Sequence, residues 1–224
     1  MGLLDRLGSR KQEAVARAPG VQAAADDPIF GTKALRKFLS SLTSRESPVL
    51  LDLGPVVGSN VSFFGEQLGC KILVEDIFAD LDRHARAGTL EDLPAFLKKR
   101  LQQETGSVDG ILCWDLFDYM DRPAAQELAV ELTRVLRPDG VLLAFFRATA
   151  QGQPNDSVYT KFIVADETNL KHRPYPAARP RQAVLVNRDI IRLFAGLQVS
   201  DSFLLQNNLR EVLFRKSASA SVPA

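Results

Sequence analysis

The sequence has 224 residues, of which 46% are hydrophobic and 25% are charged, a composition typical of a globular domain. Lysine and arginine number 28 and aspartate and glutamate number 27, for a formal net charge of +1. This balance argues against a broadly basic DNA-binding chain and against an acidic disordered chain. A chain of this length buries roughly 70% of its unfolded surface, so it needs no disulfide or metal to fold.

The cysteines and the hydropathy pattern predict a cytoplasmic, soluble protein. Cys70 and Cys113 each lie in an apolar run, which is typical of buried thiols in a reducing compartment. The longest apolar run, residues 141–146, has the length of a strand and falls short of the roughly 18 residues of a membrane span. The N-terminus is too short and too charged for a secretory signal.

The sequence predicts three regions. Residues 1–27 form an N-terminal arm, partly helical or flexible, which packs on its own domain or binds a protein partner or a membrane surface. Residues 28–216 form one α/β domain with an insertion at about 148–183. Residues 217–224 are small and polar and form a disordered tail.

Helical and strand patterns alternate along the domain. Helices are predicted through residues 35–42, 63–68, 93–101, 122–135 and 187–194, with Asp121 and Asn187 as N-caps. Strands are predicted at residues 49–53, 71–75, 108–115, 141–146, 197–205 and 209–214. The turn of residues 206–208 predicts a final antiparallel hairpin, and a second hairpin is expected within residues 159–170. No third strand is visible between residues 76 and 106.

Strands that are apolar on both faces, alternating with helices, indicate a mostly parallel sheet covered by helices. Ligands of such sheets bind beyond the carboxyl ends of the strands, where the strand order reverses. The turn after the first of these strands reads Asp52-Leu53-Gly54-Pro55-Val56-Val57-Gly58. Glycines allow a ligand to approach the backbone closely. Glu75, at the end of the next strand, can accept two hydrogen bonds from the vicinal hydroxyls of a ribose.

These residues resemble the first motif of class I S-adenosylmethionine-dependent methyltransferases, a hydrophobic strand followed by Asp/Glu-x-Gly-x-Gly-x-Gly. Glu75 stands where this superfamily keeps the acid for the ribose. Residues 108–120 resemble the fourth-strand motif, residues 132–143 the Leu-Arg-Pro-Gly-Gly turn, and residues 187–215 the closing helix and hairpin. The resemblance covers about residues 30–216. It implies a Rossmann-like α/β fold, with a mostly parallel seven-stranded-type sheet, a C-terminal antiparallel hairpin and helices on both faces.

The resemblance also implies S-adenosylmethionine as cofactor and S-adenosylhomocysteine as product. The cofactor-binding residues that it implies are Asp52, Gly54, Val56, Gly58, Asn60, Glu75, Asp76 and Asp115. Asp52 could hold the N–H groups of the turn or the ammonium of the ligand. Asp76 either assists at the ribose or caps the next helix. Glu91 and Asp92 either contact the adenine or lie at a solvated helix start.

The first motif departs from the family pattern at Val56, where the family usually has glycine. Pro55 fixes its own φ and Val56 disfavours positive φ, so the loop cannot copy the glycine conformation. Ser59 and Asn60 could supply compensating hydrogen bonds to the amino-acid part of the ligand.

No catalytic motif is visible, and the candidates for a base are Asp115, Asp118 and Tyr119. Methyl transfer to a hydroxyl or an amine mainly needs positioning and one base, because the sulfonium is already activated. Trp114 and Phe117 either wall the methyl donor or belong to the core, in which case Asp118 is a helix cap. The two histidines lack ligand-like companions, so no metal is expected.

Residues 171–181 are basic and rich in proline. They either contact an anionic substrate or RNA, or form a polyproline-like strap on the surface.

The sequence thus predicts an S-adenosylmethionine-dependent methyltransferase that acts on an O or N atom of a small-molecule acceptor. The alternative is a non-catalytic, methyltransferase-like binding or scaffold protein, which Val56, the missing third strand and the missing catalytic motif favour. A nicotinamide-dependent oxidoreductase is a third reading, and the terminal hairpin argues against it.

Overall fold

The computed structural model describes residues 27–148, 157–182 and 184–218. The predicted N-terminal arm, except for Asp27, and most of the predicted tail lie outside these residues. The strands are β1 Ile29–Gly31, β2 Val49–Asp52, β3 Lys71–Val74, β4 Val108–Trp114, β5 Leu136–Arg147, β6 Val158–Asp166, β7 Asn169–Pro176, β8 Gln198–Leu204 and β9 Leu209–Arg215. The helices are α1 Ala34–Thr43, α2 Gly58–Ser62, α3 Ile77–Ala87, α4 Leu93–Leu97, α5 Arg122–Val135 and α6 Asn187–Leu193.

Three shorter turns of helix complete the fold. A π-helical turn, η1 (Phe63–Gln67), continues α2, and two 3-10 turns, η2 (Leu90–Asp92) and η3 (Leu116–Tyr119), precede α4 and follow β4.

The central sheet has the order β3-β2-β4-β5-β9-β8. Pairing is parallel from β3 through β5, and the terminal β8–β9 hairpin is antiparallel. This confirms the predicted mixed α/β fold with its C-terminal hairpin. The described residues between β3 and β4 form helices and turns but no strand, so the sheet has six strands and β3 lies at its edge.

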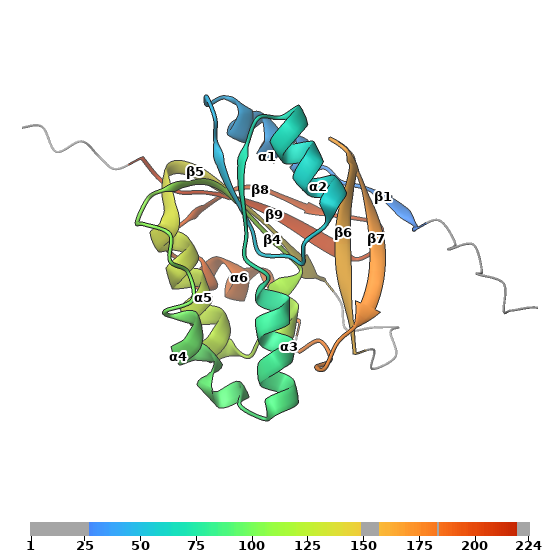
Figure 1. The fold of residues 1–224 in the computed structure, drawn as a ribbon, viewed down its shortest axis with the longest axis vertical. Helices are drawn as coiled ribbons and strands as arrows, with labels where there is room; N and C mark the ends of the chain where they lie inside the picture. The colour runs from blue at the N-terminus through green and yellow to red at the C-terminus, as the bar shows by residue number, and fades with distance from the viewer. Residues whose placement is uncertain (1–26, 149–156, 183, 219–224) are drawn as a thin grey trace, which may run out of the picture.

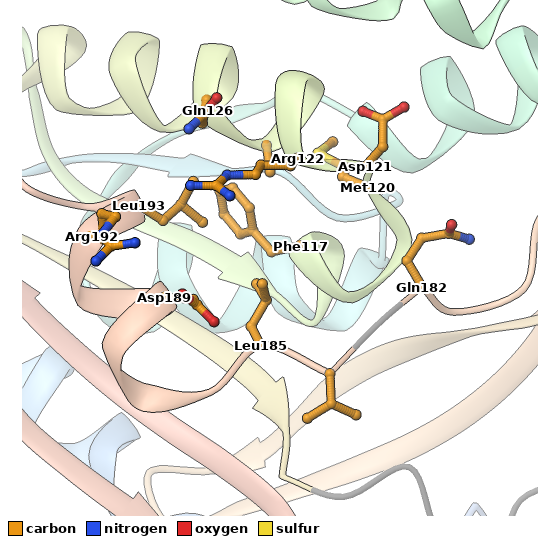
Figure 2. Close-up of a pocket in the computed structure, with 12 residues that line it drawn as sticks. Phe117, Met120, Asp121, Arg122, Gln126, Gln182, Leu185, Asp189, Arg192 and Leu193 are labelled. Carbon is orange, nitrogen blue, oxygen red and sulfur yellow. The ribbon is translucent and has the colours of Figure 1, made fainter.

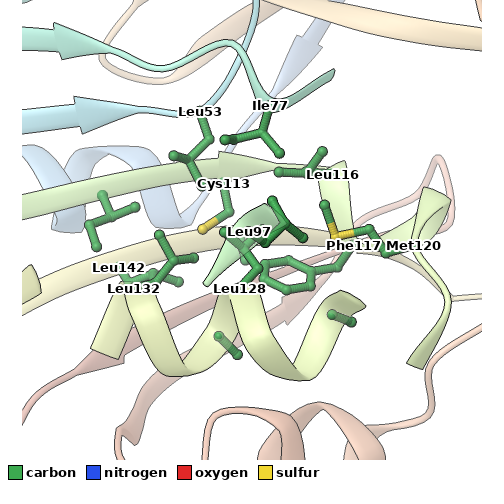
Figure 3. Close-up of a cluster of buried hydrophobic side chains, with 14 of the residues drawn as sticks. Leu53, Ile77, Leu97, Cys113, Leu116, Phe117, Met120, Leu128, Leu132 and Leu142 are labelled. Carbon is green, nitrogen blue, oxygen red and sulfur yellow. The ribbon is translucent and has the colours of Figure 1, made fainter. Parts of the chain in front are cut away.

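Helices cover both faces of the sheet (Figure 1), and the buried side chains form two hydrophobic cores. Helices α3, α4, α5 and α6 contribute to one core, where Leu128 and Leu132 of α5 face Cys113 of β4 and Leu142 of β5 (Figure 3). Helix α1 and η1 contribute to the other core. Because β4 is buried along its whole length, the tip of this strand lies between the two cores, where it can hold a rigid site.

A second, three-stranded sheet has the order β1-β7-β6. The hairpin predicted within residues 159–170 is confirmed, and its second strand extends to Pro176. The prediction of a polyproline-like surface segment over the whole of residues 171–181 is therefore wrong, because residues 171–176 pair with β6. One face of the hairpin packs into the core beside α1, through Phe162, Val164 and Leu170.

The helix ends confirm one predicted cap and correct another. Asp121 Oδ1 accepts a hydrogen bond from the backbone N–H of Ala124 and caps α5. Asn187 is instead the first residue of α6, which has no side-chain cap. Helix α3, which the sequence analysis did not identify, is capped by Asp76 at its start, while Gly88 at its end has a φ of 69°.

Candidate functional site

The carboxyl ends of β2 and β3 bring two predicted acids to the same edge of the sheet. These strands pair in parallel, with Asp52 opposite Val74, and the backbone N–H of Glu75 donates to Asp52 O over 2.8 Å. Asp115 follows β4, which is the neighbour of β2 on its other side. Three acids predicted to bind the cofactor therefore lie at the tips of three adjacent strands.

Asp52 is buried, with 5% of its surface exposed. Its Oδ1 accepts hydrogen bonds from the backbone N–H of Gly54, over 2.9 Å, and from Trp114 Nε1, over 2.6 Å. Burial raises the pKa of this carboxyl to about 6, although the two hydrogen bonds oppose the shift. Asp52 thus holds an N–H group of the turn, as one of its two predicted roles required.

The two glycines of the turn have different environments. A Cβ on Gly54 would lie 2.7 Å from Cδ1 of Trp114, whereas a Cβ on Gly58 would meet no atom within 4 Å. Val56 is 65% exposed. None of the residues 54–58 has a positive φ, so the turn follows a path open to Pro55 and Val56 and does not use the left-handed conformation of glycine.

Glu75 is half-buried and lies in a network of charged groups. Its Oε2 accepts a hydrogen bond from Arg100 Nη1 over 2.5 Å, and its Oε1 accepts one from Gln103 Nε2 over 2.8 Å. Arg100 also donates to Asp80 Oδ2 over 2.6 Å. These contacts hold the carboxylate of Glu75 at the strand tip.

Two other residues predicted at the cofactor site have structural contacts. Asp76 Oδ1 accepts from the backbone N–H of Ala79, so of its two roles the structure shows the helix cap. Asn60 is buried and uses both ends of its amide: Nδ2 donates to Phe162 O, and Oδ1 accepts from Val164 N, each over 2.8 Å. Asn60 therefore fastens α2 to strand β6.

Glu91 and Asp92 lie in η2, at the start of α4, and both are exposed. This is the arrangement expected for a solvated helix start.

The three candidate bases are buried together at the tip of β4. Asp115 is 1% exposed, Asp118 4% and Tyr119 0%. Asp115 Oδ2 accepts a hydrogen bond from Arg181 Nη2 over 2.9 Å, and Asp118 Oδ2 accepts one from the backbone N–H of Arg147. Asp118 is not a helix cap, because Asp121 caps α5. Trp114 and Phe117 are both buried in the core.

The three groups differ in their protonation. Burial, followed by the nearby Asp115 carboxylate, raises the pKa of Asp118 to about 7. Burial also raises the pKa of Asp115, while the guanidinium of Arg181 opposes that rise. Burial raises the pKa of the Tyr119 phenol far above its usual range, so Tyr119 stays protonated. The raised pKa of Asp118 lets this carboxyl exchange a proton near neutral pH.

The segment from β6 to α6 covers these acids, which the sequence analysis did not foresee. The ring of Tyr159 lies against the rings of Phe78 and Tyr119, and the ring of Tyr175 lies against that of Tyr159. After β7, residues 177–182, which we call the strap, cross the strand tips. The backbone N–H of Ala178 donates to Asp82 Oδ1, and that of Gln182 donates to Asp118 O. No periodic pattern links these aromatic and basic residues to β4, so the sequence held no local signal for the contacts.

Comparison with known proteins identifies this arrangement. Residues 51–144 match the family model described as a methyltransferase domain. This match supports the resemblance to class I S-adenosylmethionine-dependent methyltransferases that the motifs indicate. The matched segment contains the end of β2, the glycine turn, β3 and β4, and thus the tips that carry Asp52, Glu75 and Asp115.

Solved structures resemble the chain at low sequence identity. The PH0226 protein from Pyrococcus horikoshii is 17% identical, with a TM-score of 0.51 and coverage of 82% of this chain and 88% of that chain. A 1,6-didemethyltoxoflavin-N1-methyltransferase from Burkholderia thailandensis, solved with 1,6-didemethyltoxoflavin and S-adenosylhomocysteine, is 16% identical, with a TM-score of 0.48 and coverage of 82% and 78%. No curated protein matches the chain.

Two hollows of the methyltransferase domain lie near the strand tips. A cleft of about 730 Å³ runs between the glycine turn and the hairpin, and its lining includes Val56, Gly58, Lys161, Lys171 and Arg173. Two residues predicted to bind the cofactor therefore face open space.

The second hollow is a pocket of about 400 Å³ between η3, α5 and α6. Phe117, Leu185 and Leu193 contribute apolar walls, and Arg122 and Arg192 stand near them (Figure 2). Both hollows have the size of small-molecule sites.

Two absences apply to the described residues. No group of three or more histidine, cysteine or acidic residues there could hold a metal ion. No helix in the same ranges is long and apolar enough to cross a membrane.

Proposed function

We propose that this chain transfers a methyl group from S-adenosylmethionine to an oxygen or nitrogen atom of a small-molecule acceptor. The observation that carries the proposal is the placement of Asp52, Glu75 and Asp115 at the tips of adjacent strands, within the segment that matches a methyltransferase domain. The buried free thiols Cys70 and Cys113 favour a reducing compartment such as the cytoplasm.

The chain offers groups that fit each polar part of the cofactor. Glu75 presents two carboxylate oxygens at the tip of β3, and it can exchange Gln103 for ribose hydroxyls while it keeps Arg100. Asp115 Oδ1 is buried without a hydrogen-bond partner in the described structure, as expected for an acceptor that awaits a ligand donor. The open space at Gly58 allows the ligand to approach the turn.

Bound S-adenosylmethionine supplies a methyl group that its sulfonium charge already activates. The chain must then orient the acceptor and remove one proton from it. Asp118 suits the second task, because its pKa of about 7 leaves roughly half of the carboxyl groups ionised at pH 7. Among the described residues, Asp118 Oδ1 has no hydrogen-bond partner, so it can accept that proton.

A non-catalytic, methyltransferase-like binding protein is the second candidate. It is favoured by the packing of Trp114 on Gly54 and by the strap, which buries Asp115 and Asp118. In this reading the site has become part of the core and binds no methyl donor.

Calorimetric titration of the full chain with S-adenosylmethionine and S-adenosylhomocysteine, with NADH as control, separates the two candidates. The enzyme reading predicts micromolar binding of the first two ligands and none of NADH. Absence of binding to the folded protein supports the second candidate.

The variant Glu75→Gln tests the ribose assignment. It should weaken S-adenosylhomocysteine binding at least tenfold, because an amide accepts hydrogen bonds with one oxygen only. Asp80→Asn is the matched control: it disturbs the same Arg100 but lies one turn into α3, so it should change affinity less than twofold. Equal losses in both variants would trace the effect to Arg100 and contradict the assignment.

A further inference from the structure

Arg181 of the strap lies in a setting that recognises cations. Its guanidinium donates to Asp115 Oδ2 over 2.9 Å and stands over the ring of Tyr119, 4.9 Å from the ring centroid. A carboxylate and an aromatic face are the two groups with which proteins bind ammonium and guanidinium ions. Asp118 is buried nearby, and its backbone carbonyl accepts a hydrogen bond from the N–H of Gln182, the residue after Arg181.

More aromatic rings extend this setting. The centroid of Tyr159 is 4.7 Å from that of Tyr119 and 5.0 Å from that of Phe78, and the centroid of Tyr175 is 5.3 Å from that of Tyr159. A second cation already uses the far end, because Lys161 Nζ lies 5.0 Å from the centroid of Tyr175. The rings, together with Asp115 and Asp118 beyond the tip of β4, form a cage for positive charge.

The cage is incompletely satisfied in the closed structure. Four buried oxygen atoms have no hydrogen-bond partner within the described residues: Asp115 Oδ1, Asp118 Oδ1, Tyr159 Oη and Tyr175 Oη. The strap arginines also leave Arg179 Nη1 and Arg181 Nε unpartnered. An unpaired buried polar atom costs about 1–3 kcal/mol. A ligand with several N–H donors can satisfy Asp118 Oδ1 and the two tyrosine oxygens, while Asp115 Oδ1 is left for the cofactor. When the strap opens, its unpaired N–H groups become hydrated.

We propose that the methyl acceptor is a small cationic amine or guanidine, and that Arg181 occupies the acceptor's place in the closed structure. This inference rests on the proposed methyltransferase function and names its substrate class. Binding of the acceptor displaces Arg181 from Asp115 and Tyr119, and the strap opens around its remaining contacts at Asp82 and Asp118.

The reaction balances without a further reactant. Asp118 takes one proton from the ammonium of the acceptor, which leaves a nitrogen lone pair. The nitrogen forms a bond to the methyl carbon as the bond from carbon to sulfur breaks, and that electron pair stays on sulfur. The products are a methylammonium ion, a neutral thioether and protonated Asp118, so the total charge is unchanged.

The test is to empty the place of Arg181 and offer a replacement cation. In the full chain, Arg181→Ala should create a site for methylguanidinium ion, measured by calorimetry without any methyl donor. We expect a millimolar dissociation constant, at least tenfold tighter than in the wild-type chain. The uncharged isostere N-methylurea should not bind, and the added change Asp115→Asn should weaken methylguanidinium binding at least tenfold.

Arg179→Ala is the matched control. Arg179 also belongs to the strap, but its side chain donates to Gln182 Oε1 and not to a carboxylate, so its removal should create no cation site. Arg181→Met, which keeps a side chain over Tyr119, replaces Arg181→Ala if that variant does not fold. Failure of folded Arg181 variants to bind methylguanidinium, or equal binding of N-methylurea, would overturn the proposal.

Transfer assays address the acceptor class directly. With S-adenosylmethionine present, Arg181→Ala should release S-adenosylhomocysteine at least tenfold faster with ethylammonium than with ethanol. A preference for ethanol would overturn the amine assignment. Since cation binding is measured without a methyl donor, its failure is distinguishable from a failure of the wild-type chain to bind S-adenosylhomocysteine, which would reject the proposed function itself.

Discussion

Trp114 Nε1 donates a hydrogen bond to Asp52 Oδ1 over 2.6 Å and thereby joins the tips of β4 and β2. The same placement brings the indole against Gly54, and Trp114 adopts it with a φ of 51°. A positive φ in a bulky residue is strained, and such strain persists where the surroundings impose it. The acid and the first glycine of the methyltransferase motif are therefore joined to the core by one aromatic side chain.

This packing predicts opposite outcomes for the two glycines of the turn. Gly54→Ala should lower the free energy of unfolding by about 1–3 kcal/mol, because its Cβ meets the indole at 2.7 Å. Gly58 is the first residue of α2, and a Cβ added there would meet no atom within 4 Å. Gly58→Ala should therefore be neutral or should stabilise the fold by about 0.5–1 kcal/mol. Urea denaturation of both variants measures the difference. Equal destabilisation would show that the turn, and not Trp114, requires glycine.

Replacement of Trp114 by phenylalanine should make stability more dependent on pH. The indole hydrogen bond favours the ionised form of Asp52, so its loss should raise the pKa of this carboxyl above about 6. We expect Trp114→Phe to cost more stability at pH 8, where the buried carboxylate is ionised, than at pH 5, where it is protonated. Unfolding curves at the two pH values test this, and equal losses would contradict it.

Asn60 should be essential to the docking of the hairpin. Asn60→Ala leaves Phe162 O and Val164 N without their partners, so we expect a loss of about 2–4 kcal/mol in unfolding free energy. Ser59→Ala is the matched control, since Ser59 is exposed on the same helix, and should change stability by less than 0.5 kcal/mol, about the limit for surface sites. Hydrogen exchange of β6 amides should accelerate in Asn60→Ala alone. Unchanged exchange would contradict the docking role.

The fold was largely predictable because its signals are local. Apolar runs mark β2 and β4, the acid after each run marks a strand tip, and Asp121 with Pro123 marks the start of α5. Val56 correctly predicted a turn that does not follow the glycine conformation.

The contacts that close the site were not predictable, because they join segments far apart in the chain. Arg181 and Asp115 are 66 positions apart, and nothing in residues 171–181 indicated which acids they would meet. Asn60 illustrates the same limit: its amide fits a ligand site by sequence, and only the position of β6 shows that both ends are used. The strand pattern predicted that Glu75 lies at a strand tip, but it did not predict that Arg100 would bind its carboxylate.

Asp118 should give the chain a measurable pH dependence of stability. Its pKa in the folded protein is raised to about 7 from an ordinary value of 3.8, so the folded state binds the proton more tightly than the unfolded state. The stabilisation is fully present below the ordinary pKa and is lost as the pH rises through about 7. The slope from this one group is at most about 1.4 kcal/mol per pH unit.

Asp118→Asn removes this contribution and keeps an oxygen that can accept from the backbone N–H of Arg147. The unfolding free energy of the variant minus that of the wild-type chain should rise steadily between pH 4 and pH 7, a window set by the ordinary and raised pKa values. At pH 8 the variant should be the more stable of the two. Urea unfolding of both proteins at unit intervals of pH measures the difference. A constant difference across that range would mean that Asp118 does not titrate there and would remove it as the candidate base.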